Sequence, residues 1–173
     1  MNSLFLQKCL LSDNVPNMII YGKSLMNQRI LSYYYDIMSI KHINEMTFNN
    51  FSYRSSLYHS EIDIKKINKE NINHFYNLLK KKINHREYYT DKKYKTIIFY
   101  NCDAIKISIQ NRLRVIIEKY RETTIFIFIS HKINNIIVPI KSRCVLIRIP
   151  NETMYDKCKI IKIVDRDTVD IDL

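Results

Sequence analysis

Residues 96–148 constrain the fold most, because apolar runs alternate there with a helical pattern. Residues 96–100 and 124–130 are rich in β-branched and aromatic side chains without strict alternation, which is typical of strands buried on both faces of a parallel sheet. Between them, apolar residues recur at helical spacing over residues 105–117, and a third apolar run covers 145–149. This order predicts βαβ units in a parallel sheet with right-handed crossovers.

Composition narrows the classes of protein that fit. The chain has 173 residues, 46% of them hydrophobic, which is enough for one core domain and argues against general disorder. It has one glycine, Gly22, although phosphate-binding loops of α/β proteins normally use several. The net charge of +11 favours a polyanionic partner, most simply nucleic acid. A lysine-rich surface that serves solubility is an equally weighted alternative.

The cysteines and histidines show no metal-binding pattern. Four cysteines are widely spaced without a C-x-x-C pair, and five histidines form no H-x-x-x-H pattern, so we expect neither a metal site nor a bound cofactor. Such isolated thiols are typical of a reducing compartment. No apolar run reaches membrane-spanning length and the N-terminus has no signal-peptide pattern. We therefore expect an intracellular protein that makes no membrane contact.

Three motifs follow one another in this stretch with a definite spacing. They are Gln110-x-x-Leu113-Arg114, Glu118-Lys119-Tyr120 and Pro139-Ile140-Lys141-Ser142-Arg143-Cys144. Together they resemble the small subunits of clamp loaders, the replication factor C family of AAA+ ATPases, in which a Walker B strand, a helix and a sensor strand precede a Ser-Arg-Cys motif. Residues 58–63 resemble a segment of one subunit type of that family, and in it we interpret His59 as structural.

The resemblance covers roughly residues 15–156 and implies an α/β fold. This is the three-layer AAA+ (P-loop NTPase-like) core, with a five-stranded parallel sheet flanked by helices. We expect residues 1–152 to form a degenerate AAA+ core domain and 153–173 to be a C-terminal remnant or tail, without the family's lid and collar. Four aspartates alternate with apolar residues in that tail, which fits either an edge strand or a frayed end.

The first part of the implied nucleotide site departs from the family pattern. A P-loop wraps phosphates with glycine-rich backbone, and adds a lysine for phosphate and a Ser or Thr for Mg²⁺. Over residues 22–29 only Gly22 remains of this pattern. Gln28 stands at the lysine position and Arg29 at the Ser/Thr position.

The second part departs in the same direction. At the two Walker B acids stand Tyr100 and Asn101, and His131 replaces the sensor asparagine. Asparagine cannot act as a general base, and tyrosine is a poor ligand for a hard cation. Asp103 is retained, at a position that does not bind metal in the family, and we expect it to cap the next helix. Because phosphoryl transfer depends on charge placed around the γ-phosphate, these changes predict a pseudo-ATPase.

Other motif positions carry implied binding roles. By resemblance, Arg143 is an arginine finger offered to a neighbouring subunit's ATP, and packing before the last strand is the alternative. Phe75 or Tyr76 is implied as a contact to the sliding clamp, although we favour core packing for Phe75. The implied DNA-contact residues are Lys65, Lys66, Lys106 and Arg112.

Three functional hypotheses follow. The first is a non-catalytic clamp-loader-like subunit, a scaffold or trans-acting finger donor in a DNA replication or viral transcription complex. It would form a hetero-oligomer with a sliding clamp, active AAA+ subunits or DNA, in the nucleus or at a cytoplasmic viral replication site. The second is a basic nucleic-acid-binding or assembly protein that keeps only the scaffold. The third is a working nucleotidase in which Glu61, Asp63 and Asp103 gather at the strand ends.

Overall fold

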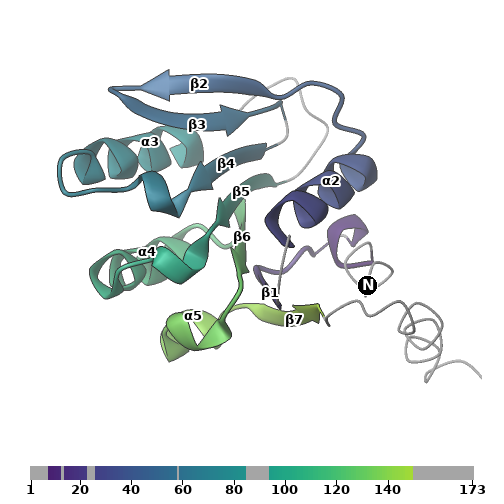
Figure 1. Ribbon diagram of the computed structural model, residues 1–173. Coiled ribbons are helices and arrows are strands. Elements are labelled where there is room, and N and C mark those ends of the chain that lie inside the picture. The colour runs from purple at the N-terminus through teal and green to yellow at the C-terminus, as the bar shows by residue number, and fades with distance from the viewer. Residues whose placement is uncertain (1–7, 13, 23–25, 58, 85–93, 150–173) are drawn as a thin grey trace, which may run out of the picture.

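The computed structural model describes residues 8–12, 14–22, 26–57, 59–84 and 94–149 (Figure 1). The expected tail over 153–173 lies outside these residues, as do most of residues 2–11, whose apolar pattern predicts a helix. The side chain of Arg29 is likewise not described.

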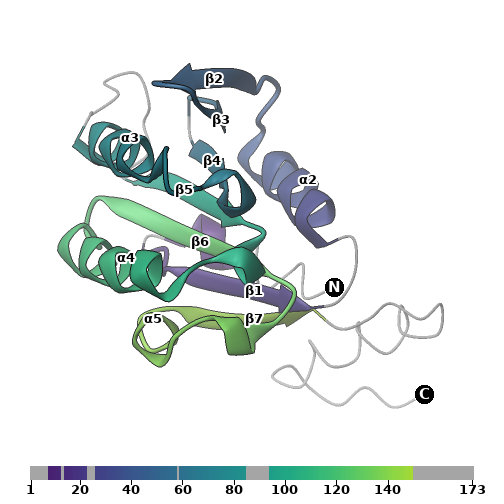
Figure 2. The same cartoon turned by 60° about the vertical axis from the view of Figure 1, so that its left-hand side comes forward.

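A single seven-stranded sheet forms the centre of the molecule, in the order β2-β3-β4-β5-β6-β1-β7 (Figures 1 and 2). The strands from β4 to β7 in this order are mutually parallel, whereas β2 and β3 form an antiparallel extension at one edge. The strands are β1 (Met18–Gly22), β2 (Asn44–Phe48), β3 (Phe51–Ser55), β4 (His59–Asp63), β5 (Lys95–Tyr100), β6 (Thr124–Ser130) and β7 (Val145–Ile149).

The predicted five parallel strands are present, and the β2–β3 hairpin widens the sheet. The sequence of residues 41–53 predicts only a short strand followed by a loop in this region. Asn49 and Asn50 connect β2 to β3 with φ of 45° and 63°. Asparagine tolerates this left-handed region, and two such residues in succession form the tight turn that matches the twist of a β-hairpin. The α/β fold class is therefore confirmed, with a wider sheet.

Helices cover both faces of the sheet and complete three layers (Figure 2). α2 (Met26–Met38) packs on one face, and α3 (Ile72–Asn84), α4 (Ile107–Lys119) and the short α5 (Val138–Lys141) lie on the other. Every residue of the central strand β6 is buried, as its uninterrupted apolar run predicted. No helix within the described residues is both long and apolar enough to cross a membrane.

Apolar residues recur at helical spacing over residues 64–87 and predict one helix, but the structure interrupts it near its start. The short 3₁₀ helix η1 (Ile64–Lys66) comes first, capped by the Asp63 carboxylate, which accepts a hydrogen bond from the Lys65 amide at 3.0 Å. Asn68 and Asn71 then exchange side-chain to backbone hydrogen bonds of 2.8 Å. These local bonds compete with helix formation and place the start of α3 at Ile72.

Candidate functional site

The carboxyl ends of the parallel strands bring several of the degenerate-site positions together. Gly22 ends β1, Tyr100 ends β5, and His131 directly follows β6. In the sheet register Tyr21 is level with Ser130, which places the ends of β1 and β6 side by side. Gln28 lies exposed in the first turns of α2, the helix that follows β1. Open α/β sheets bind ligands at this edge, and the substituted positions lie there.

Asn101 bonds within the protein at this edge. Its backbone is left-handed, with φ of 56°, and its side-chain nitrogen donates a 2.8 Å hydrogen bond to Oδ1 of Asp63 at the end of β4. The amide therefore ties the ends of β4 and β5 together. The neighbouring Tyr100 is half-buried and packs against the apolar core between α2 and the sheet. Burial, and secondarily the Asp63 charge, raises the pKa of the Tyr100 phenol, which keeps it neutral.

Asp103 holds the segment after β6, and the expectation that it caps α4 is wrong. Its carboxylate accepts hydrogen bonds from the amides of His131 at 2.9 Å and Lys132 at 2.7 Å, and from the Ser130 hydroxyl at 3.0 Å. The short helix η2 (Cys102–Ala104) separates it from α4, whose N-cap is Lys106, without a side-chain cap. Burial alone would raise the pKa of Asp103, but these hydrogen bonds outweigh it and lower the pKa.

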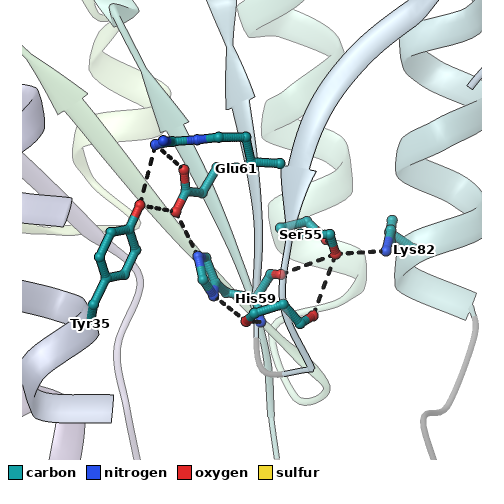
Figure 3. Close-up of polar contacts among 8 residues, drawn as sticks. Tyr35, Ser55, His59, Glu61 and Lys82 are labelled. Atoms are coloured by element: carbon teal, nitrogen blue, oxygen red, sulfur yellow. Dashed lines mark hydrogen bonds and ion pairs between the residues drawn. The ribbon is translucent and has the colours of Figure 1, made fainter. Parts of the chain in front are cut away.

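Glu61, a residue of β4, lies at the centre of a polar cluster and is fully buried (Figure 3). Its Oε1 accepts hydrogen bonds from Nε2 of His59 at 2.6 Å and from the Tyr35 hydroxyl, and its Oε2 pairs with Nη2 of Arg54 at 2.5 Å. Burial would raise the pKa of Glu61, but the hydrogen bonds from His59 and Tyr35 and the nearby positive charge lower it. Because the carboxylate only accepts, Nε2 of His59 carries the proton, and Nδ1 lies 2.6 Å from the Ser56 hydroxyl.

This cluster joins three elements and leaves no open carboxylate site. Tyr35 comes from α2, Arg54 from β3 and Glu61 from β4, so α2 is fastened to the hairpin side of the sheet. The acids Glu61, Asp63 and Asp103, which the nucleotidase hypothesis gathers, bind separate partners. Within the described ranges, no group of three or more His, Cys, Asp or Glu residues could hold a metal ion.

Sequence reasoning missed Tyr35 and Arg54, although Arg54 carried a signal. Once β3 and β4 are paired, Arg54 lies opposite Glu61 in the register, and opposite charges at such positions attract each other. The missing step was to recognise the hairpin. Tyr35 has no comparable signal, because its partner lies 26 residues away on another element.

Arg143 lies just after α5, on the surface. Its Nη1 donates a 2.6 Å hydrogen bond to the carbonyl of Pro139, and its Nη2 pairs with the Glu118 carboxylate of α4. The arginine side chain is 37% exposed and that of Glu118 is 45% exposed. Cys144 turns inward instead, and burial raises the pKa of its thiol to about 12. The Ser-Arg-Cys motif thus packs its cysteine and presents its arginine.

Gln110 fixes the segment that carries Arg143. This buried side chain donates to the Asn135 carbonyl at 2.8 Å and accepts from the Ile137 amide at 2.8 Å, immediately before α5. Satisfying these backbone groups with one amide holds the start of α5 against α4. The motif glutamine in α4 and the motif arginine after α5 therefore belong to one packed unit.

The basic candidates separate into two places. Lys65 and Lys66 are exposed in η1, Lys106 is exposed at the start of α4, and η1 contacts η2, so these lysines share the carboxyl edge of the sheet. Lys66 also donates a 2.9 Å hydrogen bond to the Ser52 hydroxyl. Arg112 lies elsewhere, with its guanidinium 4.7 Å from the ring centre of Tyr76 on α3.

Phe75 and Tyr76 differ in what they offer to a partner. Phe75 is fully buried and packs near the rings of Phe51 and Phe99, so it is a core residue without a surface for a clamp. Tyr76 is 9% exposed, beside Arg112. Burial raises the pKa of Tyr76 despite that neighbouring cation.

Proteins with similar sequences include replication factor C subunits. The chain is 25% identical over 157 residues to the putative replication factor C small subunit of Acanthamoeba polyphaga mimivirus, which covers 83% of this chain and 42% of that protein. It is 29% identical over 75 residues to replication factor C subunit 3 of Bos taurus, covering 43% of this chain and 21% of the relative. The chain thus spans less than half the length of these relatives.

Solved structures share the fold. A DNA polymerase III gamma subunit-related protein of Thermotoga maritima matches with a TM-score of 0.61 at 13% identity, over 91% of this chain and 48% of that one. RuvB of the same organism matches with a TM-score of 0.57 at 9% identity, over 95% of this chain and 49% of that one.

A family model supplies the assignment. The model for the DNA polymerase III delta subunit matches residues 21–153, from the end of β1 to just beyond β7. The matched residues include β4 to β7, the end of β1, the degenerate edge and the Ser-Arg-Cys segment. The chain therefore belongs to the DNA polymerase III delta subunit family and has the AAA+ fold of clamp-loader proteins.

Proposed function

We propose that this chain is a non-catalytic clamp-loader-like subunit, which serves as a scaffold and supplies Arg143 to the ATP site of an active AAA+ neighbour. The observation that carries the proposal is the end of β5, where Tyr100 and Asn101 occupy the positions of the two Walker B acids. Phosphoryl transfer in this fold needs a carboxylate for Mg²⁺ and a group that orients the attacking water.

The side chains around this edge support the proposal, because they serve the fold. The Asn101 amide binds Asp63, and the Asp103 carboxylate accepts from the backbone after β6. Asp63 and Asp103 are thus engaged by groups of the protein itself.

Arg143 supports the second half of the proposal. An arginine offered in trans needs an exposed guanidinium and does not require its own subunit to bind nucleotide. Arg143 meets this requirement, since its side chain is 37% exposed on the helical face that carries α4 and α5. Such fingers raise phosphoryl-transfer rates by about 10³–10⁵.

The remaining parts of the proposal concern partners and place. The exposed Lys65, Lys66 and Lys106 suit duplex phosphates, and the net charge of +11 points the same way. We propose a hetero-oligomer with active AAA+ subunits and a sliding clamp in a DNA replication or viral transcription complex. The nucleus or a cytoplasmic viral replication site would be its location.

The first test combines nucleotide binding with partner capture. Calorimetry on the isolated chain should show no binding of ATP or ADP, and affinity capture from the native source should recover an AAA+ ATPase or a sliding clamp. In the recovered complex Arg143→Ala should lower ATP hydrolysis by about 10³-fold or more, because the finger is removed. Lys141→Ala, two residues away, is the matched control. ATP hydrolysis by the isolated chain would contradict the pseudo-ATPase proposal.

The second candidate function is plain nucleic-acid binding, which the shared position of the three exposed lysines favours. It predicts duplex DNA binding by the isolated chain, without dependence on an ATPase or clamp. Replacing Lys106 by alanine should reduce the slope of log affinity against log salt by about 1 if the lysine contacts a phosphate. Arg143→Ala would then leave every measured activity unchanged.

A further inference from the structure

We propose that Glu118 is a positioning residue for Arg143. The Glu118 carboxylate holds the Arg143 guanidinium in a parked conformation, within its own subunit, until phosphate oxygens bound to a neighbouring subunit replace the carboxylate. This inference rests on the proposed function and adds the regulation of the same arginine. It assigns a role to an acid on the other helix of the α4–α5 unit.

Three contacts hold the Arg143 guanidinium within its own subunit. Nη2 pairs with Oε1 of Glu118, while Nη1 donates to the Pro139 carbonyl at 2.6 Å and lies 3.2 Å from the Ser142 hydroxyl. The Pro139 and Ser142 contacts come from the segment that carries the arginine. Glu118 is the contact from a separate element, and it determines whether the side chain lies against α4.

The place of Glu118 in its helix runs against local preference. It lies in the last turn of α4, next to Lys119, and the partial negative charge of a helix C-terminus disfavours a carboxylate there. α4 has no acid in its first turn, where one would be favoured. Pairing with Arg143 is the compensation that the structure shows. Residues that break a local rule in this way are expected at functional positions.

The chemistry of exchange favours phosphate over this carboxylate. An exposed Arg–Glu pair is weak, because water and salt screen it. A triphosphate offers more charge and paired oxygens that match the planar fork of an arginine. Glu118 would therefore hold Arg143 away from dilute anions and release it to a nucleotide that an assembled neighbour presents.

The first arm of the test measures the contact in the isolated chain. Phenylglyoxal modifies accessible arginines, and peptide mass spectrometry reports the rate at Arg143 with exposed Arg148 as the internal reference. Glu118→Gln should raise the Arg143 rate about two- to fivefold, as expected for loss of a typical exposed ion pair. Glu118→Asp should restore most of the protection. Glu122→Gln, at an exposed acid just beyond α4, is the matched control.

The second arm measures the consequence in the recovered complex. Glu118→Gln should lower the concentration of this chain needed for half-maximal ATP hydrolysis while leaving the maximal rate unchanged, because a released finger engages more readily. An unchanged rate of phenylglyoxal modification at Arg143 in Glu118→Gln would overturn the proposal. If Arg143→Ala inactivates the complex but Glu118→Gln leaves the concentration for half-maximal hydrolysis unchanged, the proposal is also overturned. If Arg143→Ala has no effect on the complex, the proposed function itself fails, whatever the first arm shows.

Discussion

Two Arg–Glu pairs in this protein differ in the surroundings of their carboxylates. The Arg54 side chain is 36% exposed, but its partner Glu61 is fully buried and has further bonds to His59 and Tyr35. Arg143 and Glu118 lie at the surface, with side chains 37% and 45% exposed. The chemical groups are the same, so the difference in environment sets what each pair can do.

Burial of Glu61 makes the Arg54–Glu61 pair a structural requirement. Exposure of both side chains allows Arg143 to exchange Glu118 for another partner. Removing Arg54 would leave the buried Glu61 carboxylate without its counterion, a change that costs about 3–5 kcal/mol in buried pairs. An exposed pair contributes about 0–1 kcal/mol, because solvent replaces the lost contact. The cluster around Glu61 therefore fastens α2 to the sheet, whereas Arg143 remains available for a partner.

The largest expected effect comes from Glu61→Ala. His59 and Tyr35 would each lose the charged acceptor of a hydrogen bond, and the partly exposed Arg54 would lose its ion-pair partner, so the free energy of unfolding should fall by about 3–5 kcal/mol. Urea denaturation followed by circular dichroism measures the change. Glu70→Ala, at an exposed residue before α3, should stay within about 0.5 kcal/mol of the wild type. A loss below 1 kcal/mol for Glu61→Ala would remove the distinction between the two pairs.

The next largest loss of stability is expected for Asp103→Asn. It keeps the side-chain shape and removes the charge that accepts from His131, Lys132 and Ser130, so stability should fall by about 2 kcal/mol at neutral pH. The lowered pKa of Asp103 fixes the sign of the pH dependence. Its contribution is complete above the unfolded-state pKa and is lost as the pH falls through the folded-state pKa. Denaturation curves of the two proteins should converge in acid.

The regular elements of the core were predictable because their signals are local. β6 and β7 have the predicted bounds, since each coincides with its own run of mainly apolar residues; β6 is buried throughout, whereas β7 buries Ile147 alone. The hairpin was missed because β2 is exposed along most of its length and lacks that signal. The break before α3 depends on the paired bonds of Asn68 and Asn71, which a helical periodicity does not reveal.

The candidate site divides in the same way. The resemblance located the substituted positions Tyr100, Asn101 and His131, and the parallel sheet gathers them at one edge. The partners of the side chains could not be predicted. Asp103 was expected to cap α4, but its carboxylate accepts hydrogen bonds from residues 27 to 29 positions later in the chain. These contacts depend on how β5 and β6 are placed next to each other. Long-range contacts of this kind require the tertiary structure.

A smaller effect is expected for Tyr35→Phe, which removes one hydroxyl from the Glu61 cluster. The carboxylate keeps His59 and Arg54, so the loss should be about 1.5 kcal/mol, in the range for a hydrogen bond to a charged group. Tyr120→Phe, on a partly exposed ring after α4, serves as the control in the same urea titration. A loss as large as that of Glu61→Ala would mean that the hydroxyl, and not the ion pair, carries the cluster.

The smallest effect on stability is expected for Arg143→Ala, and this result would sharpen the comparison most. Glu118 would be left in water without a buried penalty, so the free energy of unfolding should change by less than about 1 kcal/mol. Thermal and urea denaturation measure this beside the ATP hydrolysis of the recovered complex, where the same variant should lose about 10³-fold or more. A loss of several kcal/mol would place Arg143 with Arg54 as a structural residue and explain the Ser-Arg-Cys motif by packing alone. An unchanged fold with a large loss of partner activity requires that the arginine act on another subunit.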